Sequence, residues 1–241
     1  MRPDPTLRNI VEVVSDAASW QHQLQVDGSL NPGALLPAFK GPRVNFKRTT
    51  VFVNYTLAKV ENNSDGPFAI PATGGLALER GPGGNDIRQR VNVAFNNQII
   101  RNFLMGMNVN AASADAYSLL TGRDDNGDGI FNDRPDGTGR NGLRARGQVT
   151  MNMFLGYQFA FGHSAPLPPG VGVFGGGNSA QVRTFDVGQA RYRLGIFMNV
   201  FNVLNRANYL GYSGTMTSPF FGRPTSVRDM RKIDFGLNLQ F

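Results

Sequence analysis

The sequence predicts an all-β protein, with about eight antiparallel strands that belong to a transmembrane β-barrel. Three observations predict this fold class. Apolar residues recur at every second position over long stretches, which is the period of a strand and not of a helix. The residues between them are Asn, Gln, Thr, Gly and occasional Arg, whereas a soluble sheet presents dispersed charge to water. Long segments rich in Gly, Pro, Asn and Asp separate several of these stretches.

The expected strands follow one another along the whole chain. They cover 8–14 (a weak pattern), 22–26, 51–57, 91–95, 103–110, 149–161, 192–200 and 233–241. The clearest case is 149–161, where every odd position from Val149 to Phe161 is large and apolar. The longest stretch, 149–161, exceeds the length of about ten residues that a tilted strand needs to cross a bilayer.

The second face of these strands is rich in asparagine. It carries Asn54, Asn92, Asn96, Asn108, Asn110, Asn152, Asn199 and Asn238. Uncharged amides and glycines fit a crowded, hydrated lumen, and the opposite apolar face would then meet lipid. A soluble two-sheet protein is the alternative interpretation of the same alternation.

The connections differ in length in a way that is typical of outer-membrane barrels. The segment 96–101 is a tight turn, whereas 60–87, 113–144 and 206–228 are long loops. Such barrels have short turns on the periplasmic side and long loops outside, and strand parity places these three loops at one end. The long connection 162–189 is the exception, because parity places it with the short turns.

Several side chains are expected at particular depths of this barrel. The interfacial aromatic girdles would contain Tyr55, Tyr157, Phe159, Phe161, Tyr192 and Phe241, and the His22 ring would also lie at an interface. On the lumen face, Arg191 and Arg193 are expected to form a cross-strand ion pair with Asp234. A path for anionic solutes is the alternative role for these two arginines.

The composition excludes several function classes. The chain has 24 Lys and Arg, 17 Asp and Glu and a net charge of +7, but the basic residues are spread along it, so no nucleic-acid partner is expected. Many of them, such as Arg88 and Arg144, fall at segment ends, where we expect them to be solvated. The absence of cysteine excludes disulfides and thiolate sites, and no nucleophile–base pair occurs, so no enzymatic activity is expected. The first residues lack the apolar region of an export signal, and no apolar run is long enough for a transmembrane helix.

The segment 124–133 (DDNGDGIFND) is the sharpest local motif. Oxygen-bearing side chains at Asp124, Asn126 and Asp128 precede a glycine, as in the first half of a calcium-binding loop. The Ile130 carbonyl and Asp133 would supply further oxygens. The position of the EF-hand's final glutamate is a proline here, so the expected Ca²⁺ site is of the short extracellular type. An Asx-rich turn without calcium is the alternative.

Four segments together resemble TonB-dependent outer-membrane receptors. The segment 197–209 (FMNVFNVLNRANY) is similar to their penultimate-strand motif, and 231–241 (RKIDFGLNLQF) to their closing strand. The segments 79–82 (ERGP) and 86–90 (DIRQR) resemble a motif of the large receptors with an N-terminal carboxypeptidase-regulatory-like domain. The segment 53–59 (VNYTLAK) resembles one of their strands. The resemblance covers nearly the whole chain, although Gln89 replaces the usual histidine.

The resemblance implies a bacterial outer-membrane protein that takes up a large solute. It implies a barrel of about 22 strands, of which residues 1–241 would form the C-terminal portion, without the plug. The partners it implies are outer-membrane lipid and lipopolysaccharide, and the assembly machinery that reads a last strand ending at Phe241. An energy-coupling protein would act only through an N-terminal part that this sequence lacks. A structural or adhesive surface barrel with calcium-binding loops is the alternative function.

Overall fold

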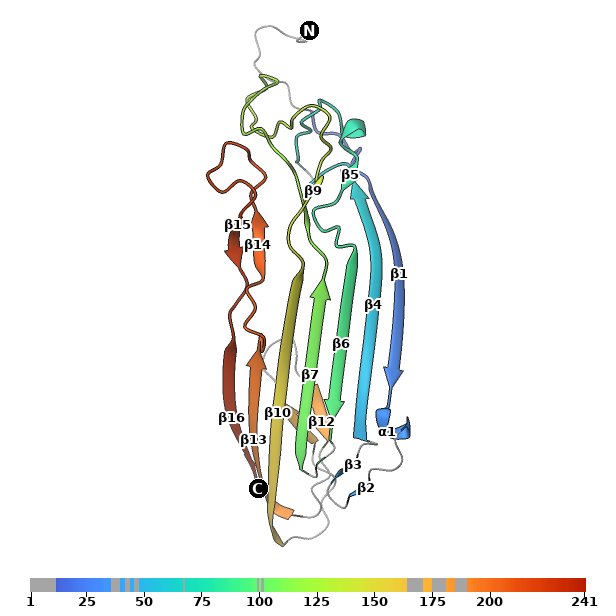
Figure 1. Ribbon diagram of the computed structural model, residues 1–241, viewed down its shortest axis with the longest axis vertical. Coiled ribbons are helices and arrows are strands. Elements are labelled where there is room, and N and C mark those ends of the chain that lie inside the picture. The colour runs from blue at the N-terminus through green and yellow to red at the C-terminus, as the bar shows by residue number, and fades with distance from the viewer. Residues whose placement is uncertain are drawn as a thin grey trace.

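The long strands of the protein form one antiparallel sheet. The computed structural model describes residues 12–35, 40–41, 44–45, 48–66, 68–98, 100, 102–163, 171–174, 181–184 and 190–241. In order across the sheet, the strands are β1 (Ser19–Leu30), β4 (Thr49–Asn62), β6 (Gln89–Asn97), β7 (Phe103–Ala112), β10 (Gln148–His163), β13 (Ala190–Phe201) and β16 (Lys232–Gln240). This is also their order along the chain, so each long strand pairs with the next (Figure 1).

The remaining elements are short. They are the helix α1 (Pro32–Leu35), the 3-10 helix η2 (Leu76–Glu79), β5 (Gly81–Pro82), and the strand pairs β2 (Lys40–Gly41) with β3 (Val44–Asn45), β8 (Ala116–Tyr117) with β9 (Leu143–Arg144), β11 (Val171–Phe174) with β12 (Gln181–Thr184), and β14 (Tyr209–Tyr212) with β15 (Pro224–Val227). Strand β5 adds to the end of β4. Within the described residues, no helix has the length and apolarity to cross a membrane.

The prediction of an antiparallel all-β fold is confirmed, but its weak first strand is wrong where it can be checked. Residues 8–11 lie outside the described residues, and 12–18 form no strand. The Asn63 side chain holds the end of this segment instead. It accepts a hydrogen bond from the Ala18 N–H at 2.7 Å and donates one to the Asp16 carbonyl at 3.0 Å.

The strand register aligns the apolar positions into rows across the sheet. One row crosses all seven long strands and contains Leu30, Val51, Phe95, Met107, Met153, Val200 and Ile233. Because successive side chains of a strand point to opposite faces, a slip by one residue would move a whole strand's apolar set to the other face. The alternation read from the sequence therefore corresponds to one continuous apolar face.

This apolar face is exposed. Its exposed members include Leu24, Val26, Val53, Leu57, Tyr157, Phe159, Phe161, Ile196, Phe235, Leu237 and Leu239. Phe235 and Leu237, on the edge strand β16, are 76% and 73% exposed. Among the described residues, only Leu104, Ala116 and Val200 are buried hydrophobics. The described part of the chain therefore packs no second layer against the sheet and forms no sandwich core.

The opposite face is held together by amide side chains. Asn92 donates to Asn110, Asn110 donates to Asn108, and Asn108 donates back to Asn92 at 3.3 Å, which closes a ring of hydrogen bonds over β6 and β7. On the neighbouring strands the Asn54 amide donates to the Asp27 carboxylate. The uncharged residues of this face thus satisfy one another across strands.

This polar face also contains an apolar patch near the end of the sheet. Leu104 is buried against Phe154, Ala160 and Phe197. The Phe197 ring lies over Gly236 of the neighbouring strand, where an added Cβ would come within 2.0 Å of the ring. Only glycine leaves the room for this cross-strand packing.

The predicted ion pair between Arg193 and Asp234 is wrong because of the register. Asp234 lies opposite Asn199, and Arg193 lies opposite Gln240. Six residues along β13 separate the two positions, which is about 20 Å. Asp234 forms its ion pair with Lys232 on its own strand, at 3.1 Å.

Three long connections share one end of the sheet as predicted, but length does not separate the two ends, because the connections 31–48 and 164–189 are also long and leave at the opposite end. The three long ones, 63–88, 113–147 and 202–231, leave the sheet at one end, and the chain terminus after β16 lies at the other (Figure 1). The connection 98–102 between β6 and β7 and the long connection between β10 and β13 leave at that other end. We call the described residues of the three long connections the loop crown.

Three asparagines end β13 and fasten it to its neighbours. Asn202 and Asn205 have left-handed backbones, with φ of 47° and 49°, a conformation that asparagine tolerates. The backbone N–H of Asn202 donates to Asn152 on β10 at 3.0 Å. Asn208 is 2% exposed, and its amide both accepts from the N–H and donates to the carbonyl of Val149, each at 2.9 Å. The asparagine motif is therefore a cap that pins the start of β10.

We expect Asn208→Ala to lower the free energy of unfolding by about 1–3 kcal/mol, because both backbone groups of Val149 lose a buried partner. Denaturant titration of the folded chain measures the change. Asn238→Ala, on the polar face of the edge strand β16, is the matched control. Equal losses for the two variants would contradict the role of Asn208 as a cap.

Candidate ligand-binding site in the loop crown

Buried carboxylates that form ion pairs with arginines hold the loop crown together. Asp86, just before β6, is 0% exposed. Its carboxylate accepts hydrogen bonds from the Val60 N–H at 2.8 Å, Arg88 at 2.7 Å and Arg144 at 2.5 Å. Burial raises the pKa of Asp86, but the hydrogen bonds from Arg144, Val60 and Arg88 outweigh it and hold the pKa below its ordinary value. Arg88 and Arg144, expected as solvated strand ends, do keep exposed side chains, at 42% and 32%, and they also join β4, β6 and β9 through one carboxylate.

Glu79 is a second buried carboxylate of the loop crown, and it links the first long loop to the second. It is 3% exposed and forms a two-pronged ion pair with Arg134, with both N–O distances at 2.8 Å. The Thr73 hydroxyl and N–H also donate to it, at 2.7 and 3.0 Å. Burial raises the pKa of Glu79, but these partners outweigh it, so the pKa lies below its ordinary value.

Arg140 completes the link between the first two loops. Its guanidinium donates to the Glu79 carbonyl at 3.0 Å and pairs with Asp65 and Asn62. Gly81 lies directly beneath, where an added Cβ would come within 2.7 Å of the Arg140 carbonyl oxygen. The segments 79–82 and 86–90, singled out in the sequence by their resemblance to a receptor motif, therefore supply the buried anchors between loops.

The second and third loops are joined through their backbones. The Leu120 N–H donates to the Gly214 carbonyl, and the Met216 N–H donates back to the Leu120 carbonyl, both at 2.9 Å. Any side chain at Gly214 would collide with the Ser118 carbonyl, because its Cβ would lie 1.8 Å from that oxygen. The crown is thus one interlocked unit made of three loops.

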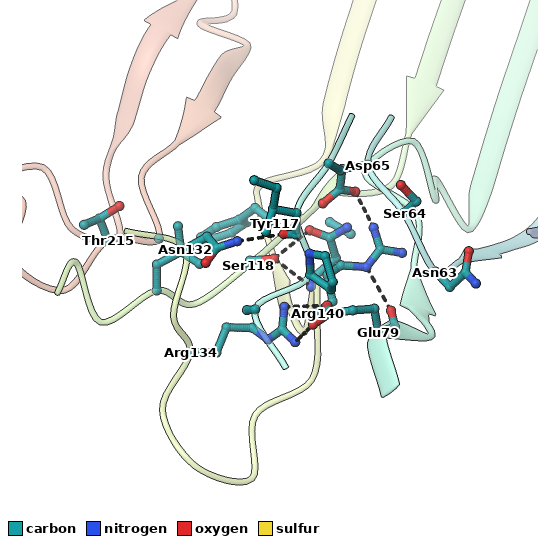
Figure 2. A pocket seen from close by; sticks show the side chains of 18 of the residues that line it. Asn63, Ser64, Asp65, Glu79, Tyr117, Ser118, Asn132, Arg134, Arg140 and Thr215 are labelled. Atoms are coloured by element: carbon teal, nitrogen blue, oxygen red, sulfur yellow. Dashed lines mark hydrogen bonds and ion pairs between the residues drawn. The ribbon is translucent and has the colours of Figure 1, made fainter. Parts of the chain in front are cut away.

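A pocket of about 490 Å³ lies where the three loops meet (Figure 2). Its polar lining residues include Asn63, Asp65, Ser118, Asn132, Arg134, Arg140, Asn141 and Thr215, and its rings are Tyr117 and Tyr212. In Figure 2, Arg134 and Arg140 reach Glu79 from the same long loop. The volume falls within the range of about 300–1,000 Å³ that is usual for small-molecule sites.

The sequence did not predict this pocket, because its walls come from segments far apart in the chain. The loop 124–133, which the sequence predicts as a calcium site, lies in the same loop crown. A second pocket, of about 330 Å³, is lined by Asp125, Asn126, Asp133 and Arg134 among others, and it shares Arg134 with the first pocket.

The residues of the predicted calcium loop form hydrogen-bonded turns. Asp124 accepts from the Gly129 N–H at 3.0 Å, and Asn126 accepts from the Asp128 N–H at 2.8 Å. The other predicted ligands do likewise: Asp128 accepts from the Ile130 N–H at 2.7 Å, and Asp133 from the Asp125 N–H at 2.8 Å. The Asn126 and Asp128 contacts, each with the N–H two residues further on, are Asx-type turns, and in all four side chains a backbone donor occupies an oxygen that a cation would use.

The fit of this loop to calcium is partial. Hard carboxylate and amide oxygens are what Ca²⁺ prefers, and one oxygen of Asp124 is buried with no hydrogen-bond partner. In the part of the chain that is described, however, no three His, Asp or Glu side chains are grouped closely enough to hold a metal ion. Calcium binding therefore stays a prediction.

Comparison with models of protein families, with curated proteins and with solved structures found no match.

Acidic pH should loosen the loop crown. The folded-state pKa values of Glu79 and Asp86 lie below their ordinary values of 4.5 and 3.8, so their stabilisation is complete above about pH 5 and is lost as the pH falls through the folded values. We expect amide hydrogen exchange in 63–88 and 113–147, corrected for intrinsic rates, to be constant from about pH 7 to 5 and to accelerate below about pH 4. Asp86→Asn should flatten this pH dependence, and an unchanged profile in that variant would contradict it.

If calcium binds 124–133, millimolar calcium should slow proteolysis near Arg123 and Arg134, with a Kd of about 10⁻⁴–10⁻³ M. Magnesium should protect less, because it demands octahedral geometry and loses its waters reluctantly. Asp128→Ala should remove the protection. A cleavage rate of the unaltered chain that calcium leaves the same would identify the segment as an Asx-rich turn only.

Proposed function

We propose that the chain forms part of the wall of a bacterial outer-membrane receptor barrel of the TonB-dependent type, which takes up a large solute. The observation that carries the proposal is the exposed apolar face, which is continuous over all seven long strands. A contiguous apolar surface of this size on a soluble protein would cause aggregation, whereas lipid is its natural solvent.

The height of the apolar face supports this proposal. The pair Phe161 and Tyr192, with ring centroids 5.6 Å apart, lies near one end of the sheet. Tyr55 pairs with Val91, which pairs through Ala111 with Val149 at the start of β10. From Val149 to Phe161 the strand rises about 40 Å, or about 30 Å across a bilayer at a tilt of about 40°. Tyr55 and the Phe161–Tyr192 pair are thus separated by about the thickness of a hydrocarbon layer, as aromatics at its two interfaces would be.

The charged and polar residues near the ends of the strands are consistent with a sheet that spans a membrane. Beyond Tyr55 on the apolar face come Lys59 and His22, which lie opposite each other on β4 and β1. Lys59 pairs with Glu61 at 2.5 Å. Charged groups return to this face where the strands would leave the membrane, and the loop crown would lie outside the cell.

The two sheet edges support a barrel larger than this sheet. In the described structure β1 and β16 each have one long-strand neighbour, so each offers a row of backbone groups for pairing. Lipid does not tolerate open edges, so further strands would have to close the barrel. The asparagine-rich face would then line the lumen, and the strand that ends at Phe241 would be the one read by the assembly machinery.

The test compares one substitution on each face of the same strand. Met153 lies on the apolar face between Met107 and Val200, and Thr150 lies on the polar face opposite Asn110. In lipid vesicles we expect Met153→Arg to lower the free energy of unfolding by about 2–4 kcal/mol and Thr150→Arg to have a much smaller effect. Thr150 is a better control than Asn152, because the Asn152 side chain also accepts the Asn202 N–H.

Equal losses at the two positions, or a chain that stays monomeric and folds cooperatively without lipid or detergent, would overturn the proposal. A structural or adhesive barrel would pass this test as well. That alternative predicts instead that removal of calcium disrupts contacts between cells while solute uptake is unchanged.

A further inference from the structure

Two Asn–Gly pairs lie in the second long loop of the crown, and their surroundings differ. They are Asn126–Gly127 and Asn141–Gly142, and the sequence contains no other such pair. Asparagine is chemically labile, and a glycine after it favours loss of the side-chain amide, because no Cβ hinders attack by the glycine nitrogen. In a folded protein the rate of this attack depends on how firmly the asparagine is held.

Asn141 is buried and bound through both ends of its amide. It is 6% exposed. Its Nδ2 donates to the Pro82 carbonyl at 2.8 Å, and its Oδ1 accepts from the Ser118 hydroxyl at 3.0 Å. Its backbone N–H donates to the same Ser118 oxygen, also at 3.0 Å. Loss of this amide would therefore require the crown to open locally first.

Asn126, in contrast, is exposed and lies at the surface of the loop. It lines the pocket of about 330 Å³, so water reaches it. A Cβ added at Gly127 would meet no atom within 4 Å, so the surroundings leave room for the backbone to move. The only contact of the Asn126 amide with a distant segment that the described residues show is a long one, from Nδ2 to the Ala72 carbonyl at 3.5 Å. The packing of the crown therefore does little to restrain this side chain.

The local contacts of Asn126 with Asp128 favour the reaction. Attack on the Asn126 Cγ places negative charge on Oδ1, and this oxygen already accepts the Asp128 N–H at 2.8 Å, as an oxyanion accepts backbone donors in an enzyme. The nitrogen that leaves gains positive charge as it takes up a proton, and it lies 3.1 Å from the Asp128 carboxylate. Asp128 thus stabilises both charges that develop in the reaction.

We propose that Asn126 is a site of spontaneous deamidation, from which the fold protects Asn141. The Gly127 nitrogen forms a bond to the Asn126 Cγ, the Cγ–Nδ2 bond breaks, and Nδ2 leaves as ammonia with the proton of the Gly127 N–H. Water then opens the resulting succinimide at either carbonyl carbon, which gives aspartate or isoaspartate at position 126. One water is consumed and one ammonia is released, and nothing is oxidised or reduced. The inference is independent of the proposed function, because it requires only that the loop is folded as described.

The new carboxylate would change the loop that contains it. Residues 124–133 already include four aspartates and no basic residue. Deamidation replaces the donor that Asp128 accepts at 3.1 Å with a second carboxylate, so an attraction becomes a repulsion. Isoaspartate also lengthens the backbone by one carbon, which displaces the Asp128 N–H from Oδ1. We therefore expect deamidation to loosen the loop and to expose the chain to proteases near Arg123 and Arg134.

The experiment incubates the full, folded 241-residue chain in heavy-oxygen water and follows both Asn–Gly pairs by peptide mass spectrometry. A second sample is incubated in denaturant. In the folded chain we expect Asn126 to lose its amide at least about tenfold faster than Asn141, because tenfold protection requires an opening that costs only about 1.4 kcal/mol. In denaturant the two rates should be similar, since the protection of Asn141 is lost. The product at position 126 should carry heavy oxygen, and its isoaspartate form should be a substrate of isoaspartyl methyltransferase.

Trypsin cleavage in the presence of a chelator measures the consequence. The aged chain should be cleaved near Arg123 and Arg134 faster than the fresh chain. Asn126→Gln is the matched control, because its longer side chain keeps the amide but closes the ring far more slowly, so ageing should leave its cleavage unchanged. The proposal is overturned by equal rates at the two pairs in the folded chain, by faster loss at Asn141, or by a rate ratio that persists in denaturant. It is also overturned if ageing accelerates cleavage of Asn126→Gln as much as that of the unaltered chain.

Discussion

The strand register is the constraint on which the rest of this structure depends. Each long strand carries an apolar and a polar set of side chains in strict alternation, and seven strands are aligned so that the apolar sets form unbroken rows. A slip of one residue in any strand would place amides in the apolar face and leucines among the asparagines. Backbone hydrogen bonds alone do not prevent this, because a slipped ladder makes as many of them. The side chains must therefore select the register.

Three kinds of contact make that selection. On the polar face, the ring of Asn92, Asn108 and Asn110 forms only when β6 and β7 are paired as observed. The packing of Phe197 over Gly236 does the same for β13 and β16, since any other residue at 236 would collide with the ring. At the strand ends, Asn208 fixes the first residues of β10, and Asp86 fixes the relation of β4 to β6 and β9. Specific side-chain contacts thus select the strand register, which burial in an apolar core does not do in the described part of this sheet.

The sequence predicted the long strands because alternation is a local property that any window of ten residues displays. It also predicted which connections are long and share one end, since that follows from strand parity. The crown contacts could not be predicted, because Arg140 and Arg144 reach partners 58 to 78 residues away. The Arg193–Asp234 pair was wrong for a related reason, because pairing depends on register and not on sharing a face. The family resemblance singled out Glu79, Asp86 and the asparagines at 202, 205 and 208, and the structure gives each of them a part in holding segments together.

The loop crown is held together by buried ion pairs, unlike the sheet. Its carboxylates and arginines are buried, and they would be costly if they were not paired with one another. Because Glu79, Asp65 and Asp86 already hold the arginines of neighbouring loops, the charges that build the crown are not available to bind a solute. The other groups that line the pocket are amides, hydroxyls and two tyrosine rings on separate loops. The same ion pairs hold the three long loops together around the pocket.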